Sequence, residues 1–474
     1  MTGLPRLRLE EVTGAPRRPV DPGTLAGAAA IVEEVRRDGE EAVRGYARGF
    51  GEIEGLKDPI VSDRSALEEA YRSLPPEQST LLRRVALRIE AFADAQRAAL
   101  DDVTLQVPGG EAGHRWLPVR SVGAYAPGGR HPLPSSVLMT VVPARVAGVE
   151  SVWVASPRPT AVTMAAAWVA GADGLLAIGG AHAIAALAFG VFSPPADLIV
   201  GPGNRWVTAA KKHLYGEVGI DGLAGPSEIV VLADDTADPA LVAADLLAQA
   251  EHDTDAIPAL VTTSRELADA VDRELERQLA DLPTSEVAQA AMGNGFSVVV
   301  EDLEQGVALV DDLAPEHLAI HLDDADAVAS RLSNYGSLFV GGSSAEAFAD
   351  YGAGPNHVLP TGGGARFQSG LSVLTYLRSP TWMRLDDPRA LVDDTALLAR
   401  LEGLEAHARA AEVRSGEDPG QASSPSSRIA DATSTNRGQP DQSFMSPALR
   451  RLGGGAPKMP FPPPLEPGAS TSAP

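Results

Sequence analysis

Residues 151–204 read SVWVASPRPTAVTMAAAWVAGADGLLAIGGAHAIAALAFGVFSPPADLIVGPGN. Three of their segments, SVWVA, GLLAIGG and DLIVGPGN, are apolar runs of strand length, and a helix-like segment follows each of them. This alternation is typical of strand-helix-strand units, so we predict a parallel sheet. Asp173, His182 and several glycines interrupt the apolar stretch from Ala165 to Phe192, which argues against a membrane span.

A second alternating region begins at EIVVLAD and continues through PALVTTS, FSVVVED, LAIHL and GSLFVGG. Residues 25–100 instead have apolar positions three and four apart, which predicts a helical opening. The expected fold class is α/β, with two Rossmann-like αβα units and helical N-terminal and C-terminal arms. No G-x-G-x-x-G fingerprint occurs, so glycine spacing alone identifies no dinucleotide site.

The amino-acid composition limits the kinds of chemistry and the kinds of partner that are expected. The 474 residues are 44% hydrophobic and carry a formal net charge of -24, which argues against nucleic acid as a partner. The absence of cysteine excludes disulfides and thiolates, so any metal needs nitrogen and oxygen ligands. An aldehyde oxidation would then use activated water in place of a thiol. No secretory signal is recognisable before Pro19, and cytoplasm is the expected location.

The stretch DPALVAADLLAQAEH has the features of a helix. Asp238 is a suitable N-cap and Pro239 suits the first helical position, so the helix is expected to run to about Glu251. Gln249 and His252 then share one face and can reach one ion. A pair with this spacing is more often simply a polar helix end.

The stretch LAPEHLAIHL places Glu316 and His317 side by side after Pro315. If a helix begins there, the two side chains point about 100° apart and can serve one site from different directions. This arrangement suits a reaction in which the histidine removes an alcohol proton and the carboxylate activates water. Taken alone, a solvated helix start explains the pair better.

Acid and imidazole groups also occur in two later segments. Asp350 precedes the glycine-rich turn YGAGPNHVLP, which contains His357, and LEGLEAHARAA contains Glu402 and His407. Ordinary turn chemistry and an exposed C-terminal helix explain these residues as well as ligation does. The loops AYAPGG, IGGAHA and GPGN let a ligand approach backbone amides, or form ordinary strand-helix turns.

Together these segments match one family in type and order. From about Ala26 to Ala411 the sequence resembles histidinol dehydrogenases, most specifically in VGAYAPGGR, PSSVLMTVVPA, AIAALAFG, GPGN, IDGLAGPSE, LLAQAEHD, APEHLAI, GAGPNHVLPTGG and SGLSV. The resemblance implies an NAD-dependent four-electron oxidation of L-histidinol through L-histidinaldehyde to L-histidine, the last step of histidine biosynthesis.

The resemblance also implies a zinc site and a homodimer. One Zn2+ per subunit would be ligated by Gln249, His252, Asp350 and His407, with His407 supplied by the neighbouring subunit. Zinc in this family is thought to anchor the imidazole and amino groups of histidinol, which suits an N/O ligand set.

The same resemblance assigns catalytic roles. His317 is implied as the base that takes the hydroxyl proton while hydride leaves for NAD, and Glu316 as the group that activates water. Substrate binding is implied for Ser227, Gln249, His252, His317, Asp350, His357, Glu402 and His407.

For the cofactor, the resemblance implicates Tyr125, Asn204 and the residue at position 182. Here the chain departs from the family, which usually has glutamine where this sequence has His182. Histidine still forms hydrogen bonds but titrates near neutrality. We therefore expect NAD use to be retained with an altered affinity or pH dependence.

The implied organisation is a domain-intertwined homodimer of multidomain chains. Its parts are an N-terminal arm (1–20), a first α/β domain with the helical opening (21–121 and 229–375), a nested α/β domain on the NAD side (122–228), a helical dimer arm (376–415) and a disordered tail (416–474). The tail is predicted from its loss of apolar periodicity.

Three alternatives stay open. One is a paralogous zinc- and NAD-dependent dehydrogenase of another amino alcohol or diol. The others are a zinc hydrolase, although no H-E-x-x-H motif occurs, and a non-catalytic metal-binding protein.

Overall fold

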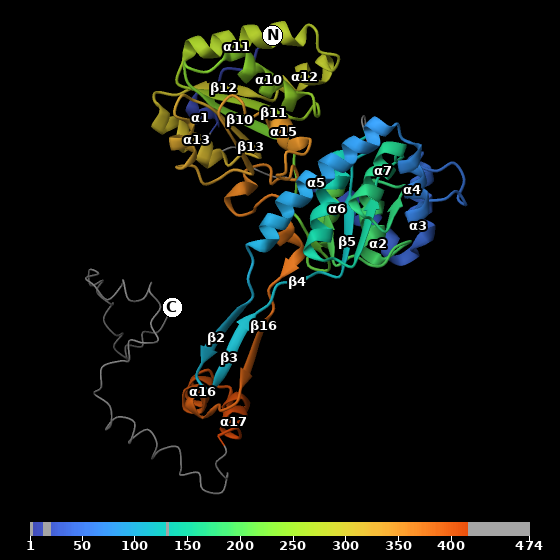
Figure 1. Ribbon diagram of the computed structural model, residues 1–474, viewed down its shortest axis with the longest axis vertical. Coiled ribbons are helices and arrows are strands. Elements are labelled where there is room, and N and C mark those ends of the chain that lie inside the picture. The colour runs from blue at the N-terminus through green and yellow to red at the C-terminus, as the bar shows by residue number, and fades with distance from the viewer. Residues whose placement is uncertain (1–2, 13–19, 129–131, 416–474) are drawn as a thin grey trace, which may run out of the picture. The chain divides into compact units, whose positions relative to one another are not determined.

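Two predominantly parallel sheets, each covered by helices on both faces, form most of the chain (Figure 1). The computed structural model describes residues 3–12, 20–128 and 132–415. The chain divides into two compact units, one of residues 1–106 and 112–383 and one of residues 107–111 and 384–474. Both large sheets belong to the first unit. The predicted disordered tail lies outside the described residues.

The first sheet has the strand order β1-β7-β6-β5-β8-β9. Its strands are β1 (Val61–Asp63), β5 (Ser121–Tyr125), β6 (Ser151–Ala155), β7 (Gly174–Leu176), β8 (Leu198–Val200) and β9 (Gly219–Ile220). Only β1 runs antiparallel to its neighbour; the other pairs are parallel. The three strands predicted within residues 151–204 are β6, β7 and β8, so the parallel sheet is confirmed.

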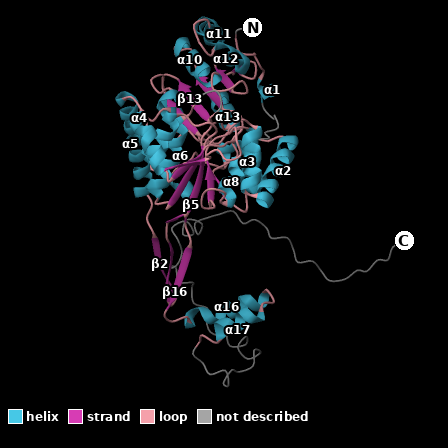
Figure 2. Ribbon diagram, turned by 90° about the vertical axis from the view of Figure 1, so that its right-hand side faces the viewer, coloured by secondary structure: helices cyan, strands magenta, loops and turns pink. Residues whose placement is uncertain are grey.

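Helices cover both faces of this sheet (Figure 2). One face carries α2 (Pro22–Asp38), α3 (Glu40–Gly49), α8 (Gly180–Phe189) and α9 (Arg205–Leu214), and the other carries α4 (Arg64–Ser73), α5 (Pro76–Ala98), α6 (Pro134–Ala147) and α7 (Ala161–Ala170). Strand residues alternate between the two cores: Val152 and Val154 of β6 join the α4–α7 core, and Ala155 joins the other.

The helical opening therefore packs on the first sheet. Residues 21–121 are therefore not grouped with 229–375 as expected, because α2 to α5 contribute to the two cores around β5, β6 and β7. Periodicity identifies the buried face of a helix, whereas it does not say which sheet buries that face.

The second sheet is wholly parallel, with the order β12-β11-β10-β13-β14. Its strands are β10 (Glu228–Ala233), β11 (Ile257–Thr262), β12 (Phe296–Val299), β13 (His317–His321) and β14 (Ser337–Val340). Its helices are α10 (Pro239–Ala250), α11 (Arg265–Leu279), α12 (Ser285–Met292) and α15 (Glu346–Asp350) around one core, and α1 (Leu9–Val12), α13 (Leu303–Leu313) and α14 (Ala325–Ala329) around the other. This confirms the second α/β region.

The beginning of the chain packs on this sheet. Ser297 of β12 donates to the Pro5 carbonyl at 2.8 Å, and Leu7 donates to the Ser297 carbonyl at 2.9 Å. Leu4 and Val12 are buried in the cores on the two faces. The described part of the expected N-terminal arm thus covers the β12 edge of the sheet, which protects unpaired backbone groups.

The remaining elements are smaller. They are β2 (Val103–Val107), β3 (Gly110–His114), β4 (Leu117–Pro118), β15 (Leu377–Arg378), β16 (Thr381–Leu385), α16 (Arg389–Leu401), α17 (Glu405–Glu412) and the 3-10 turns η1 (Gly364–Arg366) and η2 (Val373–Tyr376). The five strands among them form a three-stranded sheet with the order β16-β3-β2 and a β15-β4 pair. No helix in the described ranges is both long enough and apolar enough to cross a membrane.

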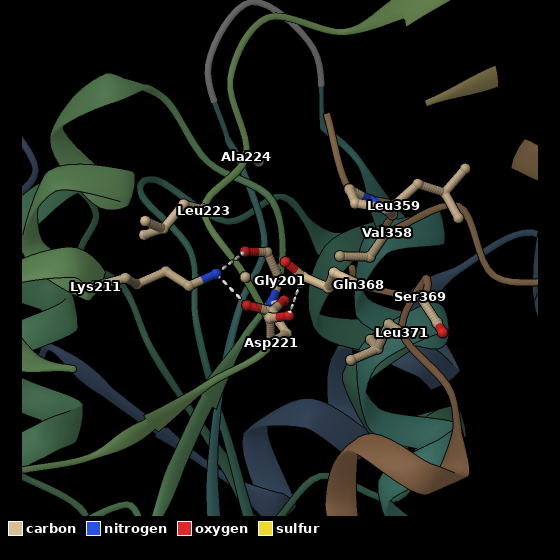
Figure 3. A pocket seen from close by; sticks show the side chains of 12 residues that line it. Gly201, Lys211, Asp221, Leu223, Ala224, Val358, Leu359, Gln368, Ser369 and Leu371 are labelled. Atoms are coloured by element: carbon tan, nitrogen blue, oxygen red, sulfur yellow. Dashed lines mark hydrogen bonds and ion pairs between the residues drawn. The ribbon is translucent and has the colours of Figure 1, made fainter. Parts of the chain in front are cut away.

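Residues 221–227 form a crossover loop that leads from the carboxyl end of the first sheet to the amino end of the second. A buried ion pair anchors its start (Figure 3). Lys211 Nζ donates to the Asp221 carboxylate and, at 3.0 Å, to the Gly201 carbonyl. Asp221 Oδ2 accepts from the Gly201 amide at 2.6 Å, and the Gln368 amide donates to the Asp221 carbonyl. Only 3% of the Lys211 side chain and 6% of the Asp221 side chain is exposed.

Replacing Lys211 with methionine should lower the free energy of unfolding by about 3–5 kcal/mol, because it leaves the Asp221 carboxylate buried without its cation. Urea denaturation followed by circular dichroism measures the change. Lys212→Met, at the exposed neighbouring position, is the matched control. A loss no larger than that of the control would show that water replaces the missing ammonium group.

Candidate active site

Glu316 and His317 lie where β13 begins, beside the start of β10. His317 is the first residue of β13 and pairs with Ile229. The predicted helix start after Pro315 is wrong, because Ala314, with a φ of 48°, ends α13 and the chain continues into a strand. The solvated position is also wrong, since only 6% of Glu316 and 3% of His317 is exposed.

Glu316 is a buried carboxyl group held by one backbone amide. Its Oε2 accepts a hydrogen bond from the Glu228 N–H at 2.9 Å. Burial raises the pKa of Glu316 well above its usual range; the Glu228 amide lowers it, and the negative potential of Glu228 and Asp350 raises it further. When ionised, such a carboxylate is a stronger base than an ordinary glutamate.

His317 presents one free ring nitrogen. Its Nδ1 lies 3.2 Å from the Glu228 carbonyl oxygen and 3.1 Å from the Gln249 amide. Its buried Nε2 has no hydrogen-bond partner among the described residues and lies 3.9 Å from Asp350 Oδ1. Burial lowers the pKa of His317 to about 3, so the ring is neutral.

The predicted helix with Gln249 and His252 is confirmed as α10. Its N-cap is Asp238, whose carboxylate accepts from the Ala240 N–H at 2.8 Å, a contact that contributes about 1 kcal/mol in helices generally. Gln249 in the last turn is fully buried, and His252 follows two residues after the helix ends. The helix end is therefore not merely a polar surface feature.

Neighbouring acceptors determine how the Gln249 amide is turned. With Nε2 donating to the Glu228 carbonyl and to Glu346 Oε1, both at 3.3 Å, the amide oxygen faces His252 Nδ1 at 3.2 Å. The oxygen of Gln249 and the ring of His252 then lie on the same side of the cluster.

Two buried carboxyl groups come from the short helix α15. Glu346 and Asp350 are one turn apart, so they lie on the same helix face. Burial raises the pKa of Asp350 to about 6 and that of Glu346 well above its usual range. One Glu346 oxygen and one Asp350 oxygen have no hydrogen-bond partner within the described ranges.

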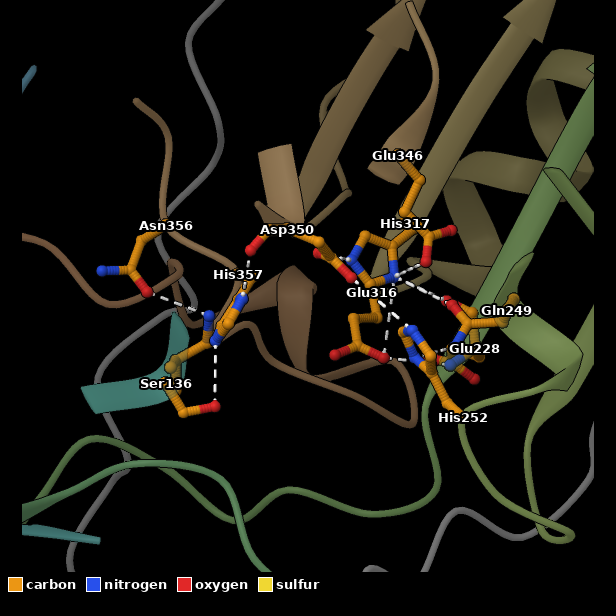
Figure 4. A network of polar contacts seen from close by, with 11 residues as sticks. Ser136, Glu228, Gln249, His252, Glu316, His317, Glu346, Asp350, Asn356 and His357 are labelled. Carbon is orange, nitrogen blue, oxygen red and sulfur yellow. Dashed lines mark hydrogen bonds and ion pairs between the residues drawn. The ribbon is translucent and has the colours of Figure 1, made fainter. Parts of the chain in front are cut away.

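These side chains converge on one point (Figure 4). One ligand atom each from His252, Glu346 and Asp350 lies within 4.8 Å of the others, and His252 Nε2 is 3.7 Å from Asp350 Oδ2. Nitrogen and carboxylate oxygen at this spacing suit a divalent metal ion. Two of the expected ligands thus meet, with Gln249 beside them.

Comparison with known proteins agrees with this geometry. The family model described as histidinol dehydrogenase matches residues 21–415. The chain belongs to the histidinol dehydrogenase family. Histidinol dehydrogenase from Thermus thermophilus is 47% identical over 398 residues, which are 83% of this chain and 95% of that protein. The enzyme from Parasynechococcus marenigrum is 45% identical over 397 residues, 81% of this chain and 89% of the relative.

A solved structure shows the same architecture. The crystal structure of histidinol dehydrogenase from Elizabethkingia anophelis superposes with a TM-score of 0.80 at 30% identity, covering 86% of this chain and 96% of the other. Histidinol dehydrogenases are NAD-dependent oxidoreductases. The oxidoreductase class expected from the sequence is therefore confirmed.

Within this histidinol dehydrogenase framework, His357 bridges the two sheets. Its Nε2 is 3.2 Å from Ser136 Oγ on α6, and its Nδ1 is 3.0 Å from the Asp350 carbonyl oxygen. Burial lowers the pKa of His357 to about 4. A neutral ring with Nδ1–H donating to that carbonyl ties Asp350 to the first sheet. Ser227 lies directly before β10, at the same end of the second sheet as Glu316.

Two expected substrate residues of the histidinol dehydrogenase pattern lie in the other compact unit. Glu402 is the C-cap of α16 and His407 lies on α17, and both are exposed. The described residues therefore bring six of the eight expected substrate residues into one unit.

The three expected cofactor residues lie at or after the carboxyl ends of strands in the first sheet. Tyr125 ends β5 and is buried, and its hydroxyl accepts from the Gly180 N–H at 3.1 Å. His182 is 1% exposed, and its Nε2 lies 2.9 Å from Glu52 Oε2. Asn204 caps α9, with its Oδ1 accepting from Trp206 at 3.0 Å and Val207 at 3.2 Å.

Three contributors were missed in the sequence: Glu346, the backbone of Glu228, and Glu52. Spacing offered a signal only for Glu346, which stands four residues before Asp350. Backbone groups carry no sequence signal, and Glu52 is 130 residues from His182. Tertiary packing alone brings those two into their sites.

Replacing Glu346 with glutamine should weaken the binding of added Zn2+ to this cluster about 10- to 100-fold, because the amide cannot ionise beside the metal ion as a carboxyl group can. Competition with a chromogenic chelator measures this affinity. Asp255→Asn, three residues after His252 and exposed, is the control. Equal zinc affinity in both variants would exclude Glu346 from the metal site.

Proposed function

We propose that the chain oxidises L-histidinol through L-histidinaldehyde to L-histidine, with NAD as the oxidant in both steps. The single observation that carries this proposal is the buried Glu316–His317 pair beside a nitrogen- and oxygen-donor cluster. The pair supplies an imidazole and a carboxylate as proton acceptors, and the cluster can anchor a substrate. The family membership of the chain agrees with this chemistry.

The donor set fits zinc. His252 and Asp350 offer one ligand each, Gln249 offers its amide oxygen, and Glu346 stands within reach as a ligand or as the acceptor of the Gln249 amide. All the donors are nitrogen or oxygen, as a chain without cysteine requires. We propose His407 as a further ligand, from the neighbouring subunit. A bound zinc would fix the orientation of the imidazole and amino groups of the substrate.

His317 is suited to remove the hydroxyl proton. Both hydrogens of the Gln249 NH2 group are used by the Glu228 carbonyl and Glu346 Oε1, so neither goes to His317 Nδ1 at 3.1 Å. The tautomer of His317 with Nδ1–H donating to the Glu228 carbonyl then has a lone pair on Nε2. That nitrogen is buried and lacks another partner within the described ranges. A substrate hydroxyl at Nε2 would be deprotonated as bound NAD accepts hydride.

Glu316 is suited to the second oxidation, which needs water. Its Oε2 is held by the Glu228 amide, and its carboxyl group lies 3.8 Å from His317 Nδ1. When ionised, it can take a proton from the water that adds to the aldehyde. Because the same buried site serves both steps, the aldehyde stays protected from solvent and from amines between them.

The cofactor side is expected at the carboxyl edge of the first sheet. In open parallel sheets, ligands bind beyond the carboxyl ends of the strands where the strand order reverses, here between β5 and β8. Tyr125 ends β5, and Gly201 follows β8 with a φ of 110°. A side chain at Gly201 would collide with the Tyr125 carbonyl. The crossover loop then leads from this edge to Glu228. The proposed cofactor edge and the Glu316–His317 pair therefore lie in the same compact unit.

We propose a homodimer through the second unit. The buried hydrophobic cluster of its described residues is Ala396, Ala399 and Ala408, and Val392 is also buried. Four leucines around these helices are strongly exposed: Leu397 at 56%, Leu398 at 59%, Leu401 at 77% and Leu404 at 44%. An apolar surface of this kind on so small a core is typical of an interface.

Purified protein with zinc, NAD and L-histidinol should form two NADH per histidinol consumed, because the complete reaction transfers four electrons. Absorbance at the NADH band gives one count and amino acid analysis gives the other. A ratio of one would mean that the reaction stops at the aldehyde. Turnover of a simple diol without turnover of histidinol would identify the paralogous dehydrogenase instead.

Mixing His317→Ala chains with His407→Ala chains should restore about a quarter of wild-type activity after subunit exchange, since half of the dimers then contain one intact site. Each variant alone should lose about 100-fold or more in kcat. Steady-state NADH formation measures both. If His407 served the site of its own chain, no mixture would recover activity.

A further inference from the structure

The first turn of α8 contains a hydrogen-bond network that links three segments far apart in sequence. Glu52 Oε1 accepts from the Gly179 N–H at 2.9 Å, and Glu52 Oε2 lies 2.9 Å from His182 Nε2. Tyr125 Oη accepts from the Gly180 N–H at 3.1 Å. Gly179 is the N-cap of α8 and has no side chain, so Glu52 supplies the negative group that a helix N-terminus favours.

Glu52 determines which nitrogen of His182 carries the proton. An ionised carboxylate only accepts hydrogen bonds, so Nε2–H donates and the neutral ring keeps a lone pair on Nδ1. The ring cannot easily turn over, because it is 1% exposed and stacks against Tyr46 at 5.8 Å and Phe50 at 5.6 Å. Nδ1 is therefore a fixed acceptor.

That acceptor is left without a partner. His182 Nδ1 is buried and makes no hydrogen bond to any described residue. A methyl group placed on Gly180, which has a φ of 66°, would have the His182 ring as its nearest side chain, with Nδ1 at 3.8 Å. A buried acceptor without a partner indicates a missing donor.

Tyr125 offers the complementary group. Its hydroxyl is used only as an acceptor in the described part of the chain, so its own hydrogen is available. Burial raises the pKa of Tyr125 to about 12, so the phenol keeps that hydrogen. The end of β5 and the first turn of α8 thus present one donor and one acceptor, both buried.

We propose that Tyr125 and His182 together recognise an adjacent acceptor and amino donor of the dinucleotide, and that Glu52 is the positioning residue that fixes the His182 tautomer. Two parts of NAD have this chemistry: the carboxamide of the nicotinamide and the amino edge of the adenine. In either case, the amino group donates to Nδ1 and the neighbouring oxygen or nitrogen accepts from Tyr125. The inference rests on the proposed NAD dependence.

Two NAD analogues distinguish the sources. Nicotinamide hypoxanthine dinucleotide replaces the adenine amino group with an oxygen, and 3-acetylpyridine adenine dinucleotide replaces the carboxamide amino group with a methyl group. The wild type should discriminate about tenfold in kcat/KM, relative to NAD, against the analogue that lacks the recognised amino group. Dissociation constants for the three dinucleotides should show the same preference.

The variants test each residue. His182→Ala should remove the discrimination and should raise the KM for NAD more than it lowers kcat. In Glu52→Gln, the amide oxygen takes the Gly179 N–H, so the amide NH2 faces His182 Nε2 and the proton moves to Nδ1. That variant should lose or invert the discrimination. Glu54→Gln, at an exposed site in the same loop, should keep it.

The failures are distinguishable. Analogue ratios that are the same in wild type and His182→Ala would overturn the recognition. If Glu52→Gln lowered the melting temperature but kept the ratios, Glu52 would be only a structural cap. If the wild type formed no NADH from histidinol, the proposed function would fail, and the dissociation constants would still test Tyr125 and His182.

Discussion

The parallel pairing of β10 with β13 is the interaction on which the candidate active site depends. Because Ile229 pairs with His317, the Glu228 backbone lies beside Glu316 and His317. The amide of Glu228 holds Glu316, and its carbonyl oxygen lies against His317 Nδ1. A shift by one residue would turn the side chains of β13 to the opposite faces. The chemistry therefore rests on a ladder of backbone hydrogen bonds, made without any special side chain.

Burial at this point gives the site its electrostatic character. Glu316, Glu346 and Asp350 all have a raised pKa, while His317 and His357 have a lowered pKa, and in each case desolvation is the largest cause. Burial favours the uncharged forms of both the carboxyl groups and the histidines. A bound cation or polar substrate would therefore restore charge to the cluster. Unsatisfied atoms on His317, Glu346 and Asp350 point to the same need.

The candidate site residues lie at opposite ends of the strands in the two sheets. The candidate cofactor residues lie at or after the carboxyl ends of strands in the first sheet, whereas Glu228 and His317 begin strands of the second. A connection as short as the crossover loop is possible because the carboxyl end of one sheet leads to the amino end of the other. His182 illustrates how such an edge is built, since its partner Glu52 comes from the loop after α3. His182 is thus buried and paired with a carboxylate from a distant part of the chain.

Local sequence determined the elements that depend on neighbours along the chain. The strands in residues 151–204, the N-cap at Asp238 and the shared α10 end of Gln249 and His252 follow from periodicity and capping, which act over a few residues. The predicted helix start at Glu316 failed because a short apolar segment such as HLAIH fits a helix or a strand equally well, and pairing with β10 decides between them. Sequence could not assign α2 to α5 to the first sheet, bring Glu346 to His252, or pair Glu52 with His182. Those contacts join residues far apart in the chain, and only the packing of buried surfaces selects them.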